Sequence, residues 1–197
     1  MIAIDTSPVR LACARHNAEI YGVADRITFI LADFVAWSTD YVERLTAGTI
    51  AAEDQVEVVF LSPPWGGIGY KTVASSPAST VTPTPTTTTT TPLAYPLAAL
   101  APLHGAELFA LARGITPNVA YYLPRNVDIE EIANLPLQYP STFHSEPTPL
   151  SDSTTTSTAL IPTKATEERV EVEEAWMGGK LKAVTCYYGQ LATGWNS

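Results

Sequence analysis

An alternation of short apolar runs with segments of helical pattern is the feature that most constrains how this chain can fold. The first run, Ile2–Asp5, ends in an acid, and the next helix is expected to start after Ser7 as N-cap and to stop at Gly22. Further apolar runs at 27–31 and 56–61 have the composition of buried strands. Strands that alternate with helices indicate βαβ units and a mostly parallel sheet.

The later part of the chain continues this pattern with two interruptions. Segments 73–92 and 139–166 are rich in Thr, Ser and Pro, and we expect both to be insertions without a packed core, the first of them disordered. The expected elements are a helix over about 35–47, a helix over 107–113, a strand over 118–123, a short helix over 128–134 with Glu131 in a capping box, and two strands over 169–176 and 181–188. Gly178-Gly179 predicts a hairpin between the last two strands.

Composition limits the function classes. A chain of 197 residues with this hydrophobic content favours one domain, and a formal net charge of -9 disfavours non-specific nucleic-acid binding, so any RNA contact is expected at a local site. Cys13 and Cys186 lie far apart without metal-ligand spacing, which predicts reduced thiols and no metal site. No stretch predicts a membrane span.

Acidic residues end the first two predicted strands. Because ligands of open α/β sheets bind beyond the carboxyl ends of the strands, Asp5 is placed to bond a ribose diol and Asp33 an adenine amino group. Each carboxylate could instead cap the helix that follows it, and the residues alone leave both interpretations open.

The segment Ser62-Pro63-Pro64-Trp65 ends the third strand and is the most specific pattern in the sequence. A proline pair followed by an aromatic residue makes a stiff loop that presents carbonyls and a ring, a layout suited to orienting an exocyclic amine and stacking on a base. A cationic base such as 7-methylguanine gains further from the indole through cation–π attraction. The alternative is a structural turn with a buried indole.

Five segments together resemble the trimethylguanosine synthase family of RNA cap guanosine-N2 methyltransferases. They are Ile2–Asp5, 17–22, 58–67, 121–126 and 180–189, and the resemblance covers nearly all of the chain outside the two insertions. It implies a Rossmann-like class I methyltransferase fold, with a mostly parallel sheet and a C-terminal antiparallel hairpin. The cofactor that it implies is S-adenosyl-L-methionine.

The resemblance also implies roles for individual residues. Asp5, Asp33, Phe34 and Ser62 would contact the cofactor, and Ser62 and Pro63 would orient the guanine amine. Trp65 would stack on the methylated base, and Arg125 with Asn126 would meet the cap triphosphate. Arg125 could instead be a surface ion-pair partner, and Asn126 could only cap the next helix.

The family pattern has a strand and a glycine-rich loop before the first acidic residue, and this sequence starts after both. We therefore expect a gap in the sheet between the strands that end at Asp5 and Leu61, and impaired methyl transfer by the chain as given. The alternative function is a catalytically inactive cap- or protein-binding module. A methyltransferase acting on adenine N6 or glutamine is disfavoured by Trp65 and Arg125.

The implied reaction converts the 7-methylguanosine cap of small nuclear and small nucleolar RNA to 2,2,7-trimethylguanosine. Capped RNA would then be the partner, with no DNA or membrane partner, and the chain is expected to be monomeric. The expected location is the nucleus, in the nucleolus or Cajal bodies, with the cytoplasm as a second compartment.

Overall fold

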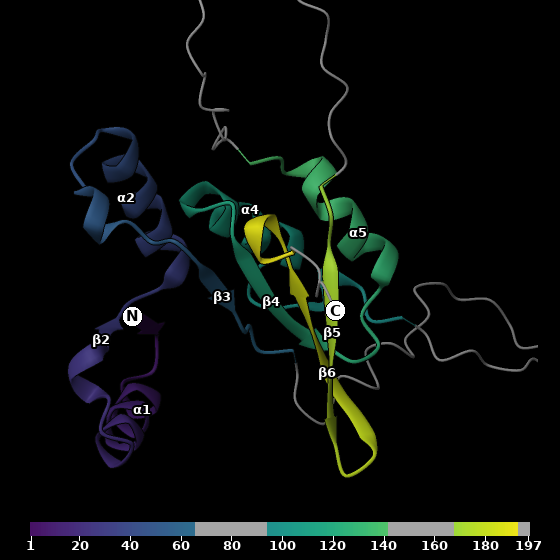
Figure 1. The fold of residues 1–197 in the computed structure, drawn as a ribbon, viewed down its shortest axis with the longest axis horizontal. Coiled ribbons are helices and arrows are strands. Elements are labelled where there is room, and N and C mark those ends of the chain that lie inside the picture. Colours follow the sequence, from purple (N-terminus) through teal and green to yellow (C-terminus); the bar gives the residue numbers. More distant parts are fainter. Residues whose placement is uncertain (66–93, 142–167, 193–197) are drawn as a thin grey trace, which may run out of the picture. The chain divides into compact units, whose positions relative to one another are not determined.

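The computed structural model describes residues 1–65, 94–141 and 168–192. These residues form two compact units, Met1–Val56 and Glu57–Ser197, which are considered separately below (Figure 1). The predicted insertion 73–92 lies outside the described residues, and so does 139–166 apart from its first three residues.

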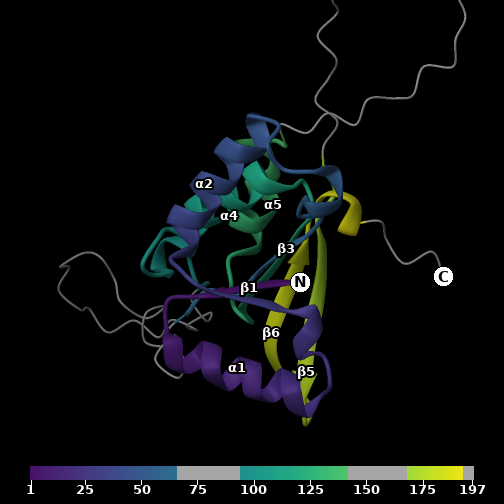
Figure 2. The ribbon, with the colours of Figure 1, turned by 90° about the vertical axis from the view of Figure 1, so that its left-hand side faces the viewer.

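The first unit is built on a βαβ arrangement. Strands β1 (Ile2–Asp5) and β2 (Thr28–Leu31) pair in parallel, and helix α1 (Pro8–Ile20) connects them and packs against both (Figure 2). Ser7 is the N-cap of α1, and Gly22 just beyond the helix has a φ of 66°, a backbone conformation that favours glycine. The predicted start and end of this helix are therefore confirmed.

Helix α2 (Phe34–Thr46) completes the first unit. Its rings at Trp37 and Tyr41 stack with centroids 5.0 Å apart, and the Tyr41 hydroxyl accepts a hydrogen bond from the Val56 backbone N–H at 2.7 Å. Few side chains of this unit are buried, and Leu31 of β2 is 60% exposed. The strands thus keep apolar surface that α1 and α2 do not cover.

The second unit contains a four-stranded sheet in the order β3-β4-β6-β5. Its strands are β3 (Val59–Leu61), β4 (Val119–Pro124), β5 (Glu171–Met177) and β6 (Lys180–Tyr187). The pair β3-β4 is parallel, whereas β4-β6 and β5-β6 are antiparallel. Gly178 and Gly179 turn the β5-β6 hairpin with positive φ values of 56° and 70°, as the sequence predicts.

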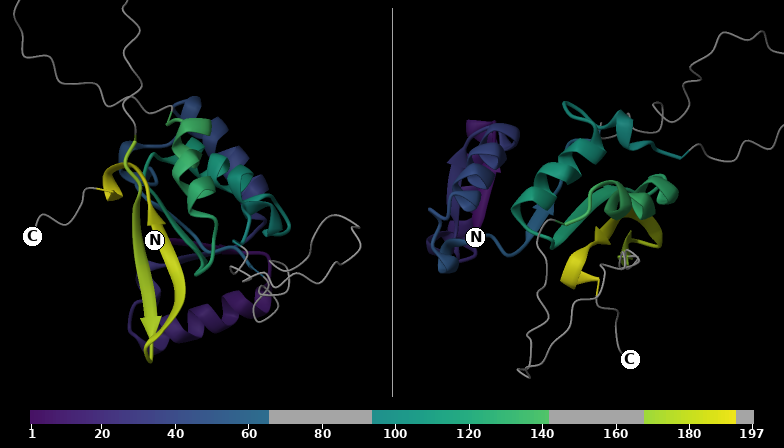
Figure 3. Two further views of the ribbon diagram at one scale, coloured as in Figure 1. Left: turned by 90° about the vertical axis from the view of Figure 1, so that its right-hand side faces the viewer. Right: turned by 90° about the horizontal axis from the view of Figure 1, so that it is seen from above.

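Helices α4 (Gly105–Ile115) and α5 (Ile129–Gln138) lie on one side of this sheet (Figure 3). Their apolar faces and the inward side chains of β4 and β6 form a core, in which the Phe109 and Tyr188 rings have centroids 4.5 Å apart. The largest fully buried side chains include Tyr95, Tyr121, Tyr188, Phe109, Leu97, Leu123, Ile132 and Leu135. Five of the six residues of β4 are buried in this core.

Among the described strands, β1 pairs with β2 and β3 pairs with β4, and the two pairs belong to separate sheets. The gap expected between the strands ending at Asp5 and Leu61 stays a prediction. Strand β3 is also shorter than the predicted 56–61, since its ladder with β4 begins only at Val59.

The predicted capping box on α5 is wrong in one of its two bonds. The Asp128 carboxylate does cap the helix by accepting from the Glu130 and Glu131 backbone N–H groups at 2.9 and 3.3 Å. The Glu131 carboxylate instead accepts the Leu97 N–H at 2.6 Å, because the Asp128 N–H already donates to the carbonyl of Tyr95. A long-range contact has replaced the local one.

A buried ion pair joins three parts of the second unit. Arg113 on α4 makes two bonds to the Glu168 carboxylate, at 2.8 and 2.6 Å, and one to the Pro117 carbonyl at 2.7 Å. Glu168 also accepts the Gly189 N–H at 2.8 Å. The Arg113 side chain is 2% exposed, so its charge depends on this single carboxylate.

Glu168→Ala is expected to lower the free energy of unfolding by about 3 kcal/mol, because it leaves the Arg113 charge buried without its partner. Denaturant unfolding followed by circular dichroism measures the change. Glu174→Ala, which removes an exposed carboxylate from β5, is the control and should change stability by less than about 0.5 kcal/mol. Equal stability of the two variants would contradict the role given to the pair.

Candidate active site

Asp5 stands at the carboxyl end of β1 and shapes the turn into α1. Its Oδ1 accepts the Ser7 N–H at 2.7 Å and the Arg10 Nε–H at 3.1 Å. Both bonds use the same oxygen, and Oδ2 has no partner among the described residues. Asp5 therefore has a local structural role and still presents one oxygen that could accept a hydrogen bond from a ligand.

Asp33 follows β2 and is the N-cap of α2. Its Oδ1 accepts the backbone N–H groups of Val35 and Ala36 at 2.8 and 3.3 Å. The capping alternative raised by the sequence is thus what the structure shows, and Asp33 is an exposed residue. Phe34, the first residue of α2, is half-buried, and its ring centroid lies 6.4 Å from that of Trp37.

The segment Ser62–Trp65 leaves the carboxyl end of β3 in the second unit. Ser62 and Pro64 are exposed, whereas Pro63 and Trp65 are half-buried. The Trp65 ring centroid lies 6.1 Å from that of Tyr122 on β4, with an angle of 57° between the ring planes. The indole is therefore partly covered by a neighbouring strand but is not sequestered in the core.

Arg125 and Asn126 directly follow β4, which is parallel to β3. Because parallel strands end at the same edge of a sheet, both residues lie at the edge from which Ser62 also departs. The Arg125 side chain is exposed, and its Nη1 donates to the Leu181 carbonyl at 3.2 Å. This bond uses only one of the five N–H donors of the guanidinium, and the other donors could engage phosphate oxygens.

The structure thus groups the predicted site residues into two sets. The first unit carries Asp5, Asp33 and Phe34 at the ends of β1 and β2, and the second carries Ser62, Pro63, Trp65, Arg125 and Asn126 at the ends of β3 and β4. Lys180 and Lys182 are exposed on the hairpin, as expected of solvated residues.

Tyr122 was not predicted from the sequence to contact the site. The sequence does contain a signal for it, because strand alternation places Tyr121 and Tyr122 on opposite faces of β4, and only one face can belong to the helix-covered core. Tyr121 is fully buried on that face. Tyr122, half-buried on the other face, is the neighbour of Trp65.

Strongly shifted ionisable groups lie in the core of the second unit. Burial raises the pKa of the Cys186 thiol to about 12 and raises the pKa values of Tyr121 and Tyr188 above their ordinary range. These groups stay neutral near neutral pH, so they are structural. On the exposed hairpin, a hydrogen bond to the Glu173 carboxylate raises the pKa of Tyr187.

Among the described residues, no group of three or more His, Cys, Asp or Glu side chains could hold a metal ion. Within the same residues, no helix is long and apolar enough to cross a membrane.

The comparison with protein families identifies the class. Residues 1–191 match the model of the RNA cap guanine-N2 methyltransferase family. The chain belongs to this family, and the order of its strands and helices agrees with the Rossmann-like fold that the sequence predicts.

A curated relative gives a more particular likeness. The chain is 37% identical over 136 residues to trimethylguanosine synthase of Schizosaccharomyces pombe (strain 972 / ATCC 24843). The match covers 68% of this chain and 45% of that protein, so the chain spans somewhat less than half the length of this relative.

Variants of Asp33 test its role as the N-cap of α2. Asp33→Ser retains a good N-cap oxygen and should leave stability within about 0.5 kcal/mol of the parent, whereas Asp33→Ala should cost about 1 kcal/mol. Thermal unfolding of the three chains measures the difference. Equal destabilisation by Ser and Ala would contradict the capping role, because only Ser retains an oxygen that can cap the helix.

Proposed function

We propose that this chain is the cap-modifying part of an S-adenosylmethionine-dependent RNA methyltransferase that adds methyl groups to the exocyclic N2 amine of a 7-methylguanosine cap. Family membership supplies the reaction class. The name of the yeast relative supports 2,2,7-trimethylguanosine as the product.

One observation carries the proposal: a stiff proline loop that ends in a half-buried indole leaves the same sheet edge as an exposed arginine. Trp65 offers a flat π-face to a cationic base, and Arg125 offers a planar fork to phosphate. These two chemistries match the two parts of a 7-methylguanosine triphosphate cap. Asn126 beside Arg125 is proposed to assist in phosphate binding.

The residues of the first unit fit a nucleoside-containing methyl donor. Oδ2 of Asp5 is available to accept a hydrogen bond from a ribose hydroxyl, and the exposed residue Asp33 uses only Oδ1 in capping, which leaves Oδ2 for an adenine amino group. Phe34, half-buried beside Asp33, can cover a face of the adenine. S-adenosyl-L-methionine, when bound, supplies a methyl group on a sulfonium that is a good leaving group.

The chain itself contributes positioning. Ser62 and the carbonyl of Pro63 are proposed to accept hydrogen bonds from the guanine amine, which orients its lone pair for in-line attack. Two consecutive prolines restrict the loop that carries these acceptors, so little conformational entropy is lost when the base binds. Well-oriented reactants can account for a large share of rate enhancement without a general base.

Two calorimetric titrations test the proposal, one with S-adenosylmethionine and one with a 7-methylguanosine cap dinucleotide. Binding of both ligands supports the methyltransferase. Binding of the cap alone would identify the inactive cap-binding module, and binding of neither ligand would overturn the proposal. A radiolabelled methyl-transfer assay with this chain, and with one extended by the upstream coding sequence, then measures activity.

Trp65→Ala should weaken binding of the cap dinucleotide by at least about tenfold, since base stacking on an aromatic side chain is worth about 1–3 kcal/mol. Fluorescence or calorimetric titration measures the affinity. Trp176→Ala is the matched control, because this indole is 60% exposed on β5 of the same unit. A cap affinity of Trp65→Ala within about twofold of the parent would exclude the stacking role.

Arg125→Ala should weaken binding of the triphosphate-containing cap by about tenfold and leave binding of the 7-methylguanosine nucleoside unchanged, because the guanidinium meets only phosphate. The slope of log affinity against log salt should also fall by about one. Lys182→Ala removes an exposed cation from the neighbouring strand and should have neither effect. Equal losses for nucleoside and triphosphate would contradict the assignment.

The proposed substrates are the caps of small nuclear and small nucleolar RNAs, and the proposed location is the nucleus, in the nucleolus or Cajal bodies. A monomer is proposed as the active form. Sedimentation at micromolar concentration and fluorescence microscopy of a tagged chain test these two statements.

A further inference from the structure

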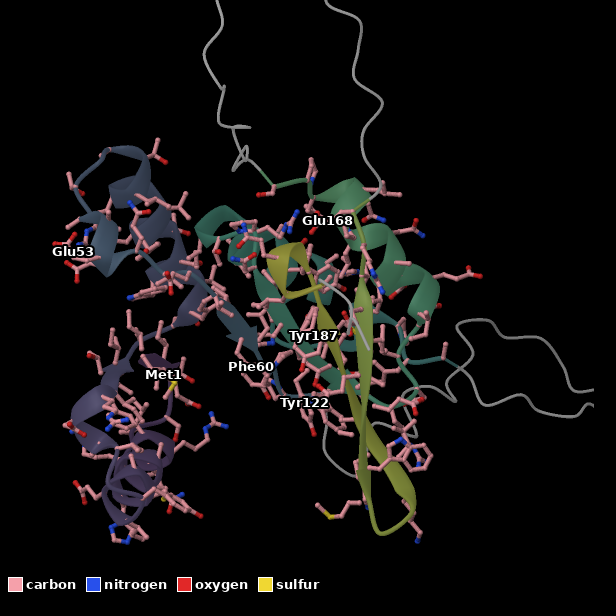
Figure 4. The ribbon with its side chains drawn as sticks, in the orientation of Figure 1. Met1, Glu53, Phe60, Tyr122, Glu168 and Tyr187 are labelled. Carbon is pink, nitrogen blue, oxygen red and sulfur yellow. The ribbon has the colours of Figure 1, made fainter. Side chains whose placement is uncertain are left out.

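The second unit contains a row of three aromatic side chains, Phe60, Tyr122 and Trp65. Tyr122 is its centre, with ring centroids 6.4 Å from Phe60 and 6.1 Å from Trp65. Figure 4 labels Phe60 and Tyr122 on the neighbouring strands β3 and β4. Phe60 is 62% exposed, so the row lies on the face of the sheet opposite the helix-covered core.

Strand register explains why Tyr122 meets the loop that carries Trp65. Leu61 pairs with Tyr121, so the next residue on β4 lies level with Ser62, where the loop begins. Tyr122 therefore stands beside the loop at its first residue. The contact between the two rings follows from the backbone pairing of β3 and β4.

A side-chain contact is important for the position of this loop, Ser62–Trp65. Pro63 and Pro64 have no backbone N–H, so two positions of the loop cannot donate the hydrogen bonds that usually fix backbone in place. Side-chain packing must then contribute more to the position of Trp65. An aromatic pair at 6.1 Å with tilted planes is a favourable arrangement for this purpose.

The tilt of the two rings bears on base stacking. At 57° between the planes, the tyrosine does not lie flat over the indole, so this contact does not itself cover an indole face. Tyr122 lies on β4 three residues before Arg125, which is the first residue after the strand. Strand β4 thereby positions the Trp65 ring through Tyr122, and it also positions the backbone of Arg125.

We propose that Tyr122 is a positioning residue for cap recognition, which holds the Trp65 indole in the orientation that stacking on 7-methylguanine requires. The inference rests on the proposed function of Trp65. It goes beyond that function by assigning the selectivity for the methylated base to a residue that does not itself touch the base.

The test compares Tyr122→Leu, which removes the ring, with Tyr122→Phe, which retains it. Tyr187→Leu is the matched control, because register places Tyr187 opposite Ala120 and hence on the same sheet face as Tyr122 (Figure 4). Affinities for 7-methylguanosine triphosphate and for guanosine triphosphate are measured for each chain. Tyr122→Val replaces the leucine variant if that one does not fold.

Tyr122→Leu should lower the affinity for 7-methylguanosine triphosphate at least about fivefold and reduce the preference for it over guanosine triphosphate. The reason is that a misoriented Trp65 indole loses cation–π attraction for the methylated base. Tyr122→Phe and Tyr187→Leu should stay within about twofold of the parent, since neither removes the contact with Trp65. Unchanged selectivity in Tyr122→Leu, or an equal loss in Tyr187→Leu, would overturn the proposal.

A second measurement does not need the cap. In a background in which Trp37, Trp176 and Trp195 are replaced by Phe, the fluorescence anisotropy decay of Trp65 reports motion of its indole. Tyr122→Leu should increase the amplitude of fast depolarisation, and Tyr122→Phe should not. If the parent chain fails to bind the cap, the proposed function fails, whereas unchanged indole motion in Tyr122→Leu refutes the positioning role alone.

Discussion

The parallel pairing of β3 with β4 is the contact that brings the candidate site of the second unit together. It involves only three residue pairs, from Val59 with Val119 to Leu61 with Tyr121. This short ladder brings the proline loop and Arg125 to one edge of the sheet, although 60 residues separate them in sequence. Strand β4 is itself held by the buried Phe109 ring of α4, which stacks on Tyr121, and by its long pairing with β6. The site residues thus stand on the best-packed strand of the described chain.

Local signals in the sequence were sufficient to predict most of the elements. Ser7 as N-cap, Gly22 beyond a helix and Gly178-Gly179 in a hairpin each act within a few residues, so their effect can be read without knowing the fold. The predicted site residues at strand ends follow from the same logic, since a parallel sheet places successive strand ends at one edge. The capping alternative for Asp33 was also open from the sequence, and the structure shows it.

Long-range partners could not be predicted, because nothing in the local sequence specifies them. Glu131 bonds a backbone N–H 34 residues away, and Arg113 bonds a carboxylate 55 residues away. From the sequence alone, the expected partner of Glu131 is the backbone N–H of the N-cap residue of its own helix. Only the path of 95–97 beside α5 shows why it accepts the Leu97 N–H instead. Tyr122 is an intermediate case. Alternation predicts the face on which it lies, but only the register of β3 against β4 shows that Trp65 is its neighbour.

The charge of the chain bears on how a capped RNA could be selected. The formal net charge of -9, to which Glu171, Glu173 and Glu174 on β5 contribute, disfavours non-specific attraction of a polyphosphate. A protein that bound RNA through many cations would gain affinity for every RNA, capped or not. Here the proposed contacts with the substrate include one guanidinium for the phosphates and one indole for the base, and the indole favours a base that carries a positive charge. A weak affinity for RNA in general therefore favours selectivity for capped RNA, because the discrimination then depends on the methylated base. In the proposed site, the orientation of the Trp65 ring decides how well that base is recognised.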